Sequence, residues 1–220
     1  PQTETYREAE IQTNAFGGIQ GAVDMTGSLT DDGVWSYRLT GLAKNLHTQI
    51  DSERDRQFMI APSLTWSPSV DTSLTVYGYF QRDRPLFMPR FYPAFGTLIS
   101  NPAGNIPRDV FLGDPTWGNF DRDFFAVGYE FDHRFNETWT VRQNLRYAGA
   151  DQDMNLVLVN PAFAYSPTPA TPTTLNRVTA IADDELRTFN LDTQAEARFD
   201  TGSFDHTLLM GVDFVRATSD

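Results

Sequence analysis

Two groups of acidic residues come closest, in type and spacing, to a metal site. Asp151 and Asp153 form the first group, and Asp183, Asp184 and Glu185 form the second, at the two ends of a long polar stretch. Oxygen-rich clusters of this kind can hold calcium. The competing interpretation, in which these side chains are loop-edge charges in water, is the favoured one.

Histidine, serine and cysteine chemistry finds no support. His47, His133 and His206 are far apart in the sequence, which argues against a metal or catalytic role. Ser63 and Ser100 lack the sequence context of an activated nucleophile. The chain has no cysteine, and therefore no disulfide, no cysteine zinc site and no thiol nucleophile. The sequence predicts that the protein is not an enzyme.

A stretch at about 83–121 is rich in aromatic and basic side chains and is the third candidate for chemistry. Its members are Phe87, Met88, Phe91, Tyr92, Phe95, Phe111, Trp117 and Phe120, interspersed with Arg82, Arg84, Arg90 and Arg108. A segment this apolar that faces water needs either packing against itself or a ligand. Both interpretations stay open at this point.

The segments around these residues alternate in polarity with a period of two. Over 186–199, odd-numbered residues such as Phe189 and Leu191 are mostly apolar, and even-numbered ones such as Asp192 and Glu196 are mostly polar. The same pattern covers 122–135, 19–29 and 205–215, and it is noisier at 34–46, 57–67, 73–81 and 138–147. Soluble strands have about 5 or 6 residues, whereas a tilted strand that crosses a bilayer needs roughly 9 to 11. The sequence therefore predicts strands that cross a membrane.

Short and long connections alternate between these segments, as in outer-membrane barrels. Tight turns are expected at 31–33, 67–71, 136–137 and 201–203, and longer connections at about 48–56, 83–121 and 151–184. Two of the long connections exceed what a compact soluble domain usually contains. We expect a single antiparallel meander with the short turns at one end and the long loops at the other.

The two faces of these strands should differ. A lipid-facing band is expected from Phe125, Val127, Phe131, Phe189, Leu191, Leu208, Met210 and Val212, with Glu130, Asp132, Asp192 and Glu196 on the opposite face. An aromatic girdle at the periplasmic head groups is expected from Trp35, Trp66, Phe135, Trp139 and Phe199, which lie near the short turns. The alternative is a soluble β-domain whose core these aromatics cap.

Composition excludes further classes of protein. The net charge of -12 argues against a nucleic-acid partner, whose phosphates attract basic surfaces. No run approaches the roughly 18 apolar residues of a membrane-spanning helix. The mean hydropathy of -0.40 is compatible with a barrel, because only every second side chain of its strands meets lipid. The chain opens without a secretory signal, so an exported protein would be present here in a mature or truncated form.

Four runs of sequence carry a family resemblance: DDGVWSYRLTGLA at 31–43, IAPSLTW at 60–66, TWTVRQNLRY at 138–147 and DHTLLMGVDF at 205–214. Together they resemble the ferrichrome-type, TonB-dependent receptors for hydroxamate siderophores. The runs are spread over most of the chain, and each corresponds to a hairpin of the barrel wall. They identify the family well and its ligand poorly.

The resemblance implies an all-β fold and a receptor in the bacterial outer membrane. We expect about nine strands, arranged as a transmembrane antiparallel meander, from a barrel of about 22 strands. The family's barrel is plugged by an N-terminal domain and imports ferric siderophores with energy from TonB. Residues 1–220 are expected to be one partial barrel domain, with the plug, the TonB-contacting region and the C-terminal strands outside it.

The resemblance also implies a ligand site and a set of partners. Phe91 corresponds to a tryptophan of the family's siderophore pocket, and Tyr92 and Phe95 follow it, so these three are the predicted ligand-binding residues. Leu158 and Asn160 occupy the positions of a tyrosine pair in the fourth loop, which favours a related hydroxamate over ferrichrome itself. The expected partners are a ferric hydroxamate siderophore, TonB and outer-membrane lipid. No cofactor is expected, because iron arrives already chelated. A passive porin remains the alternative among barrels.

Overall fold

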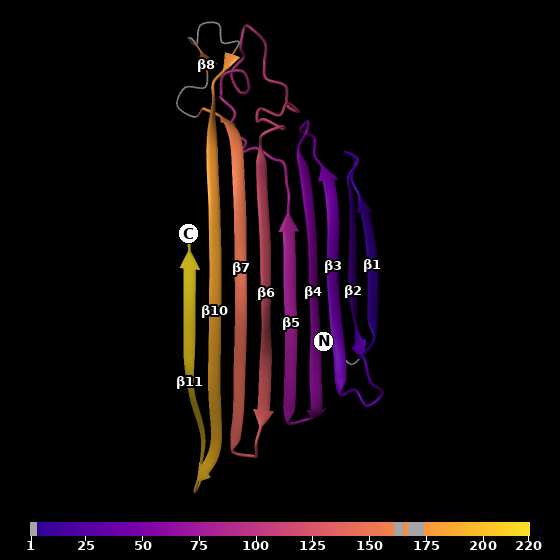
Figure 1. Cartoon of the computed structure of the whole chain (residues 1–220), viewed down its shortest axis with the longest axis vertical. Helices are drawn as coiled ribbons and strands as arrows, with labels where there is room; N and C mark the ends of the chain where they lie inside the picture. Colours follow the sequence, from indigo (N-terminus) through magenta and orange to yellow (C-terminus); the bar gives the residue numbers. More distant parts are fainter. Residues whose placement is uncertain (1–3, 161–164, 167–173) are drawn as a thin grey trace.

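The computed structural model describes residues 4–160, 165–166 and 174–220, and it is built from strands (Figure 1). One nine-stranded sheet has the order β1-β2-β3-β4-β5-β6-β7-β10-β11, and β8 and β9 form a separate pair. The strands of the large sheet are β1 (Tyr6–Thr13), β2 (Ile19–Ser28), β3 (Trp35–His47), β4 (Arg54–Ser69), β5 (Thr72–Asp83), β6 (Asn119–Arg134), β7 (Trp139–Val159), β10 (Arg177–Thr201) and β11 (Phe204–Ser219). The short pair is β8 (Tyr165–Ser166) and β9 (Thr174–Leu175).

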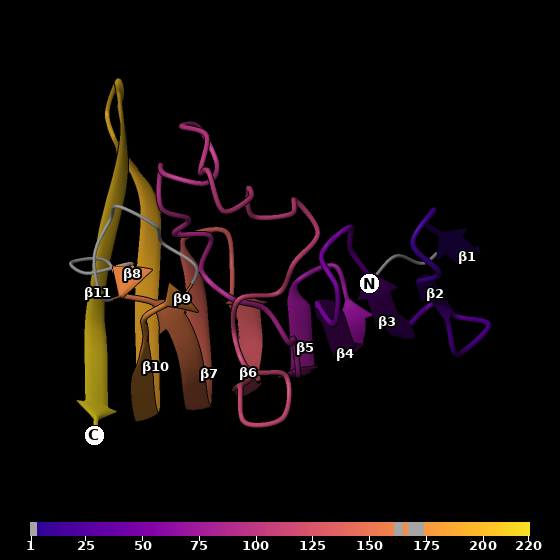
Figure 2. The same ribbon diagram turned by 90° about the horizontal axis from the view of Figure 1, so that it is seen from above.

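The large sheet is an antiparallel meander, as expected. Every neighbouring pair of its strands is antiparallel, and each strand pairs with the next one along the chain apart from the β8–β9 excursion. The sheet curves without closing, and β1 and β11 lie at its two open edges (Figure 2). This shape is that of a section of barrel wall.

The connections separate into two ends of the sheet, which confirms the predicted topology. The β2–β3, β4–β5, β6–β7 and β10–β11 turns lie at one end, and the 84–118 connection and the described residues between β7 and β10 lie at the other (Figure 1). Gly33 and Gly202 occupy turns at the first end with φ of 71° and 66°. Such angles suit glycine, which lacks a Cβ. We call the two ends the turn end and the loop end.

Some strand bounds differ from the expected ones. β7 and β10 pair without interruption from Trp139↔Ala197 to Val159↔Arg177, so the expected loop at 151–184 is shortened to 160–176. The acidic residues of 151–153 and 183–185 therefore lie inside these strands, and their placement at loop edges was wrong. β1 was not predicted, because its eight residues are mostly polar and exposed on both faces. Most of the Pro/Thr-rich stretch at 166–174 lies outside the described residues.

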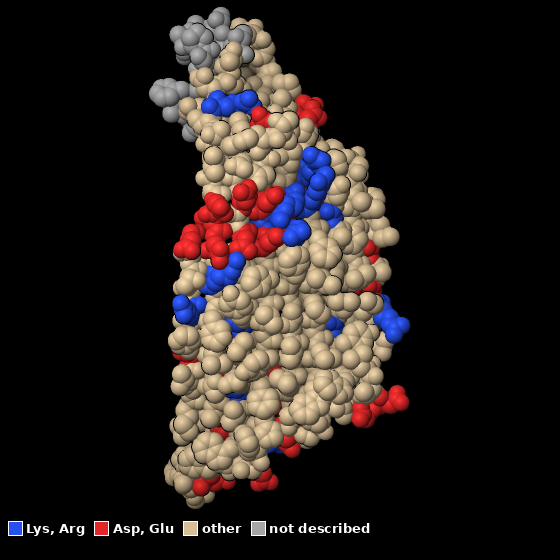
Figure 3. All heavy atoms as spheres, in the orientation of Figure 1, with Lys and Arg blue, Asp and Glu red and all other residues tan. Residues whose placement is uncertain are grey.

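One face of the sheet is apolar and convex. Pairing places Val127 opposite Tyr147 and Tyr147 opposite Phe189, so these residues share a face. Leu191 lies opposite Phe214 on the same face. Figure 3 shows this face as a broad surface with few charges below a charged upper zone. The expected apolar band is confirmed, and no second sheet covers it within the described ranges.

The concave face is polar and carries ion pairs between strands. Arg142 contacts both Asp132 and Glu196, with N–O distances of 2.9 and 3.1 Å. Arg38 and Asp24 lie 2.8 Å apart on the same side of the sheet. The acids expected to point away from lipid therefore do so.

The expected aromatic girdle lies at the turn end. Trp35 lies opposite Trp66 in the β3–β4 register, and their ring centroids are 6.3 Å apart. Phe135 and Trp139 flank the β6–β7 turn, where the Phe135 amide donates to the Trp139 carbonyl at 2.9 Å. Both of these rings are exposed, and so is Phe199 near the β10–β11 turn.

Across the described part of the chain, no helix has the length and apolar character needed to span a membrane.

Candidate functional site

The long β5–β6 connection, residues 84–118, lies mainly over the concave side of the sheet at the loop end (Figure 2). Its base continues the sheet: the Arg54 and Leu86 backbones exchange two hydrogen bonds of 2.8 Å each. Leu86 and Met88 are buried at 8% and 4% exposure. Self-packing therefore accounts for the base of the loop. Its tip keeps apolar side chains such as Leu98 in water.

The shorter connection between β3 and β4 contacts the 84–118 loop through the buried side chain of Glu53. Glu53 accepts a 3.1 Å hydrogen bond from Arg90 and a 2.5 Å hydrogen bond from the Thr48 hydroxyl. Its carboxylate is almost wholly buried, so the pair is shielded from water on the Glu53 side. The Asp51 amide also donates to the Asp109 carbonyl at 2.7 Å. These contacts fix the two loops relative to each other.

A pocket of about 520 Å³ lies between the two loops. Arg90 and Arg108 supply its charged hydrogen-bond donors, Gln49 and Asn105 add amides, and Tyr92 adds a phenol ring. Its lining includes no acidic residue among the described ones. The arrangement suits a ligand that presents oxygen acceptors to the protein.

Tyr92 lines this pocket. Its hydroxyl donates to the Val110 carbonyl at 3.3 Å, which ties the two halves of the loop together. Burial raises the pKa of the Tyr92 phenol, and nearby Arg90 opposes part of that effect. The phenol therefore remains a neutral group at physiological pH.

The three predicted ligand residues are not brought together in this pocket. Tyr92 lines it, whereas Phe91 and Phe95 do not. Phe91 is 65% exposed beside it in the chain, and Phe95 pairs with Ile99 in an isolated bridge. From the sequence, Arg90 and Arg108 were identified only as charged residues among aromatic ones, and neither was predicted to bind a ligand.

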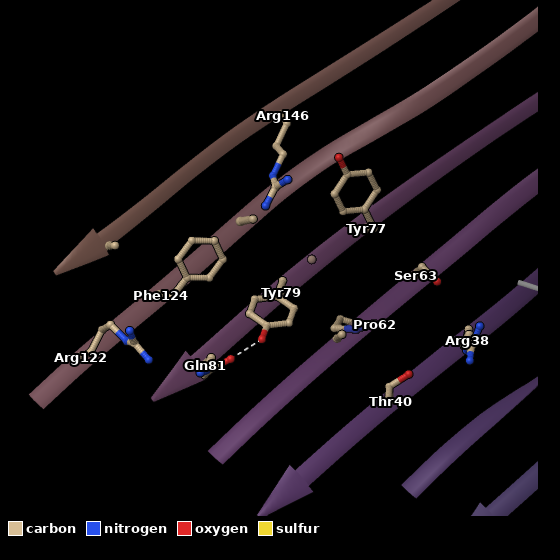
Figure 4. A pocket seen from close by; sticks show the side chains of 14 residues that line it. Arg38, Thr40, Pro62, Ser63, Tyr77, Tyr79, Gln81, Arg122, Phe124 and Arg146 are labelled. Atoms are coloured by element: carbon tan, nitrogen blue, oxygen red, sulfur yellow. Dashed lines mark hydrogen bonds between the residues drawn. The ribbon is translucent and has the colours of Figure 1, made fainter. Parts of the chain in front are cut away.

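A second hollow of about 800 Å³ lies on the concave wall itself, and it was not predicted from the sequence. Figure 4 shows the rings of Tyr79 and Phe124 next to each other, with Arg122 and Arg146 on either side of Phe124. The two rings meet edge to face with centroids 5.5 Å apart. Arg122 is held by the buried carboxylate of Asp83 at 2.6 Å. Like the loop pocket, this hollow combines arginine side chains with a tyrosine ring.

The other candidate residues have structural partners. Asp151 pairs with Arg187 at 2.6 Å, and within the described ranges no acidic or histidine side chains are grouped to hold a metal ion. His133 contacts the Thr72 hydroxyl at 2.8 Å, and His206 contacts that of Thr201 at 2.5 Å. Asp151, His133 and His206 thus serve contacts between neighbouring strands.

The fourth-loop positions differ from the expected placement. Leu158 lies within β7 opposite Val178, and the Asn160 amide donates to the Asn176 carbonyl at 2.9 Å just beyond the strand. Both residues therefore lie at the end of the extended β7–β10 pair.

Comparisons of the sequence with known proteins agree with this geometry. A model of the family described as TonB dependent receptor-like, beta-barrel, matches residues 61–220. The ferrichrome outer membrane transporter/phage receptor of Escherichia coli (strain K12) is 38% identical over 232 aligned residues, which cover 100% of this chain and 31% of that protein. The ferrioxamine B receptor of Salmonella typhimurium (strain SL1344) is 31% identical over 88% of this chain and 26% of that protein.

Solved structures share the fold. The ferric-catecholate import receptor Fiu of E. coli K12 superposes with a TM-score of 0.82 at 20% identity, covering 100% of this chain and 35% of that one. The pyoverdine receptor FpvA of Pseudomonas aeruginosa PAO1, bound to pyoverdine, gives 0.82 at 18% identity, covering 99% and 31%. The chain thus spans about a quarter to a third of the length of these proteins.

Proposed function

The chain belongs to the TonB-dependent receptor β-barrel family, and we propose that the intact protein imports ferric siderophores of the hydroxamate type across the outer membrane. The relatives that match the chain at 38% and 31% identity are named for ferrichrome and ferrioxamine B, which are hydroxamates. TonB supplies the energy through a part of the protein outside residues 1–220. The protein acts as a receptor and transporter and not as an enzyme.

The loop pocket is the observation that carries this proposal. A ferric hydroxamate presents carbonyl and hydroxamate oxygens around a metal that it already chelates, so the protein needs hydrogen-bond donors and no metal ligands. Arg90 and Arg108 offer such donors over the concave side, where a ligand enters the barrel. Phe91 does not line the pocket, but it is exposed next to Tyr92 in the chain and would offer apolar ring surface to the organic shell of the siderophore.

The hollow on the concave wall extends the same chemistry toward the interior. Arg122 and Arg146 point donors into it from β6 and β7, and Tyr79 and Phe124 supply ring surface (Figure 4). The two hollows are consistent with a route for one class of oxygen-rich ligand.

The two alternatives make different predictions. A soluble β-domain requires its apolar face to be covered, whereas Val127 and Val212 on the convex face are 49% and 72% exposed. A passive porin would admit its solutes without an energy source. Uptake of radiolabelled ferric hydroxamate should therefore be abolished in cells that lack TonB, and undiminished uptake would support the porin.

Ligand binding itself is tested by titrating the full-length receptor with ferric hydroxamates. Contact with one ring is worth roughly 0.5 to 1.5 kcal/mol beyond its area, so Phe91→Ala should weaken binding by several-fold to tenfold. Arg90→Gln should weaken it as well. Phe135→Ala is the matched control, because it removes an exposed ring at the turn end. Equal affinity of the Phe91→Ala and Arg90→Gln variants and the wild type would refute the site assignment.

A further inference from the structure

The loop pocket carries an unbalanced positive charge. Of its two arginines, Arg90 is paired with the buried Glu53 at 3.1 Å, so its charge is balanced within the protein. Arg108 has no such partner, because among the described residues no carboxylate lies within ion-pair distance of its guanidinium group. The nearby acids Asp51 and Asp109 do not line the pocket. A ligand in the pocket therefore meets the charge of Arg108.

The hydrogen-bonding groups of the lining favour an anion over a cation. Oδ1 of Asn105 already accepts a 3.0 Å hydrogen bond from the Asn101 amide, which leaves the NH2 group of Asn105 as a donor. The Gly96 carbonyl likewise accepts from the Ile106 amide at 2.8 Å. A ligand cation would find no carboxylate in the described lining, whereas an anion would find the N–H groups of Asn105 and Arg108.

Apolar side chains accompany Arg108 in the pocket. Leu98, Ile106 and Pro107 line it together with Ile50, which is 5% exposed. Such walls exclude water from one side of a bound ligand and so strengthen the attraction between Arg108 and an anion. A ligand with an apolar arm that ends in a negative group fits both features.

We propose that Arg108 makes the loop pocket selective for the charge at the end of the siderophore. A ferric hydroxamate that carries a carboxylate is favoured over a neutral one, and a neutral one over one with a free ammonium group. The carboxylate accepts hydrogen bonds from the Arg108 guanidinium, which can bind it through two nitrogen atoms at once. An ammonium in the same place is repelled. The inference rests on the proposed function, because it places a hydroxamate in this pocket.

The test compares three ligands that share one iron centre. Ferrioxamine B is a linear ferric trihydroxamate that ends in an ammonium group, its N-acetyl derivative ends in a neutral amide, and its N-succinyl derivative ends in a carboxylate. Titration of the full-length receptor in uncharged detergent, followed by quenching of tryptophan fluorescence, gives Kd for each. The succinyl form should bind most tightly and the ammonium form least, with roughly two- to fivefold at each step, as for a part-exposed ion pair.

The ratio of the Kd values for the ammonium and succinyl forms separates a charge effect from a structural one. Arg108→Gln should bring this ratio close to one, whereas Arg108→Lys should keep the order of the three ligands. Arg56→Gln is the charge-matched control, because Arg56 is an exposed arginine of β4 outside the lining, and it should keep the wild-type ratio. A variant that only disturbs the loop would weaken all three ligands alike. Salt at about 1 M, where the Debye length is about 3 Å, should shrink the wild-type ratio.

The outcomes distinguish this inference from the function on which it rests. Equal Kd values for the three ligands in the wild type, or an unchanged ratio in Arg108→Gln, would overturn the selectivity while leaving hydroxamate binding in place. Failure of all three ligands to bind the wild type would remove the proposed function, and the inference with it.

Discussion

Leu191→Arg tests whether the convex face spans the hydrocarbon layer. Leu191 lies in β10 between Leu145 and Phe214, so its neighbours on both adjacent strands are apolar. An arginine there would have to leave water or deform the bilayer. Near the midplane of an outer-membrane barrel, this substitution costs about 2 to 4 kcal/mol, and the cost falls to about 0 to 1 kcal/mol at the interfaces.

The depth of Leu191 can be worked out from the register. Ala197 lies opposite Trp139 in the girdle, and Arg187, in the charged row at the loop end, is ten residues further along β10. Ten residues span about 33 Å along a strand, or about 25 Å along the membrane normal at a tilt of about 40°. This distance equals the usual height of the apolar band of an outer-membrane barrel, so the Trp139 row and the Arg187 row mark its two edges. Leu191 lies about 15 Å above the girdle row, close to the middle.

The assay is reversible unfolding of the full-length receptor in phospholipid vesicles with guanidinium chloride. Leu191→Arg should lower the free energy of unfolding by about 2 to 4 kcal/mol. Asn144→Arg is the matched control, because Asn144 lies on the concave face between Glu130 and Asp192. If the two variants are equally stable, the convex face does not meet lipid at that depth.

Three further outcomes are expected. Glu53→Ala leaves Arg90 without its buried partner, so limited proteolysis should cut the 84–118 loop faster than in the wild type while the unfolding temperature of the barrel stays the same. Arg142→Gln should change the free energy of unfolding by less than about 1 kcal/mol, because the Arg142 ion pairs are part-exposed, and chemical denaturation measures it. Burial raises the pKa of Tyr92, so the protonated phenol contributes stability that is present below the usual tyrosine pKa and is lost as the pH rises through the raised value. The measurement is tyrosinate absorbance as a function of pH. The difference between the wild type and Tyr92→Phe should appear at a higher pH than the titration of the exposed tyrosines.

The strands of the wall could be predicted from the sequence because one physical rule fixes them. Where a strand crosses lipid, alternate side chains must be apolar, and the pattern at 122–135 located β6 (Asn119–Arg134) to within a few residues. The rule fails where a strand leaves the bilayer. β7 and β10 continue past the apolar band, and there both of their faces meet water. Because of charged residues such as Asp151 and Glu185, the sequence of these segments therefore resembled that of a loop.

The site could be predicted only in part, because its geometry comes from distant contacts. Phe91, Tyr92 and Phe95 are close together in the sequence, but the pocket combines Tyr92 with Gln49 and Arg108. Their meeting depends on the buried Glu53, which comes from another connection. A local pattern carries no signal for such a contact. The arginines of the segment were the available hint, since basic residues among aromatics supply donors for an oxygen-rich ligand.

The wall and the loops thus have different sequence determinants, and this bears on how such a receptor changes its ligand. The apolar alternation of the wall is constrained by lipid over its whole height, so substitutions such as Leu191→Arg are costly. The loop pocket is held by a few contacts, chiefly Arg90 with Glu53 and Tyr92 with Val110, while the residues around them face water. Substitutions at exposed positions such as Phe91 can therefore alter the ligand surface without altering the barrel. Under the proposed function, a change of ligand is expected to be encoded in the loops first and in the concave hollow around Tyr79 and Arg122 second, because Arg122 is tied to the wall by the buried Asp83.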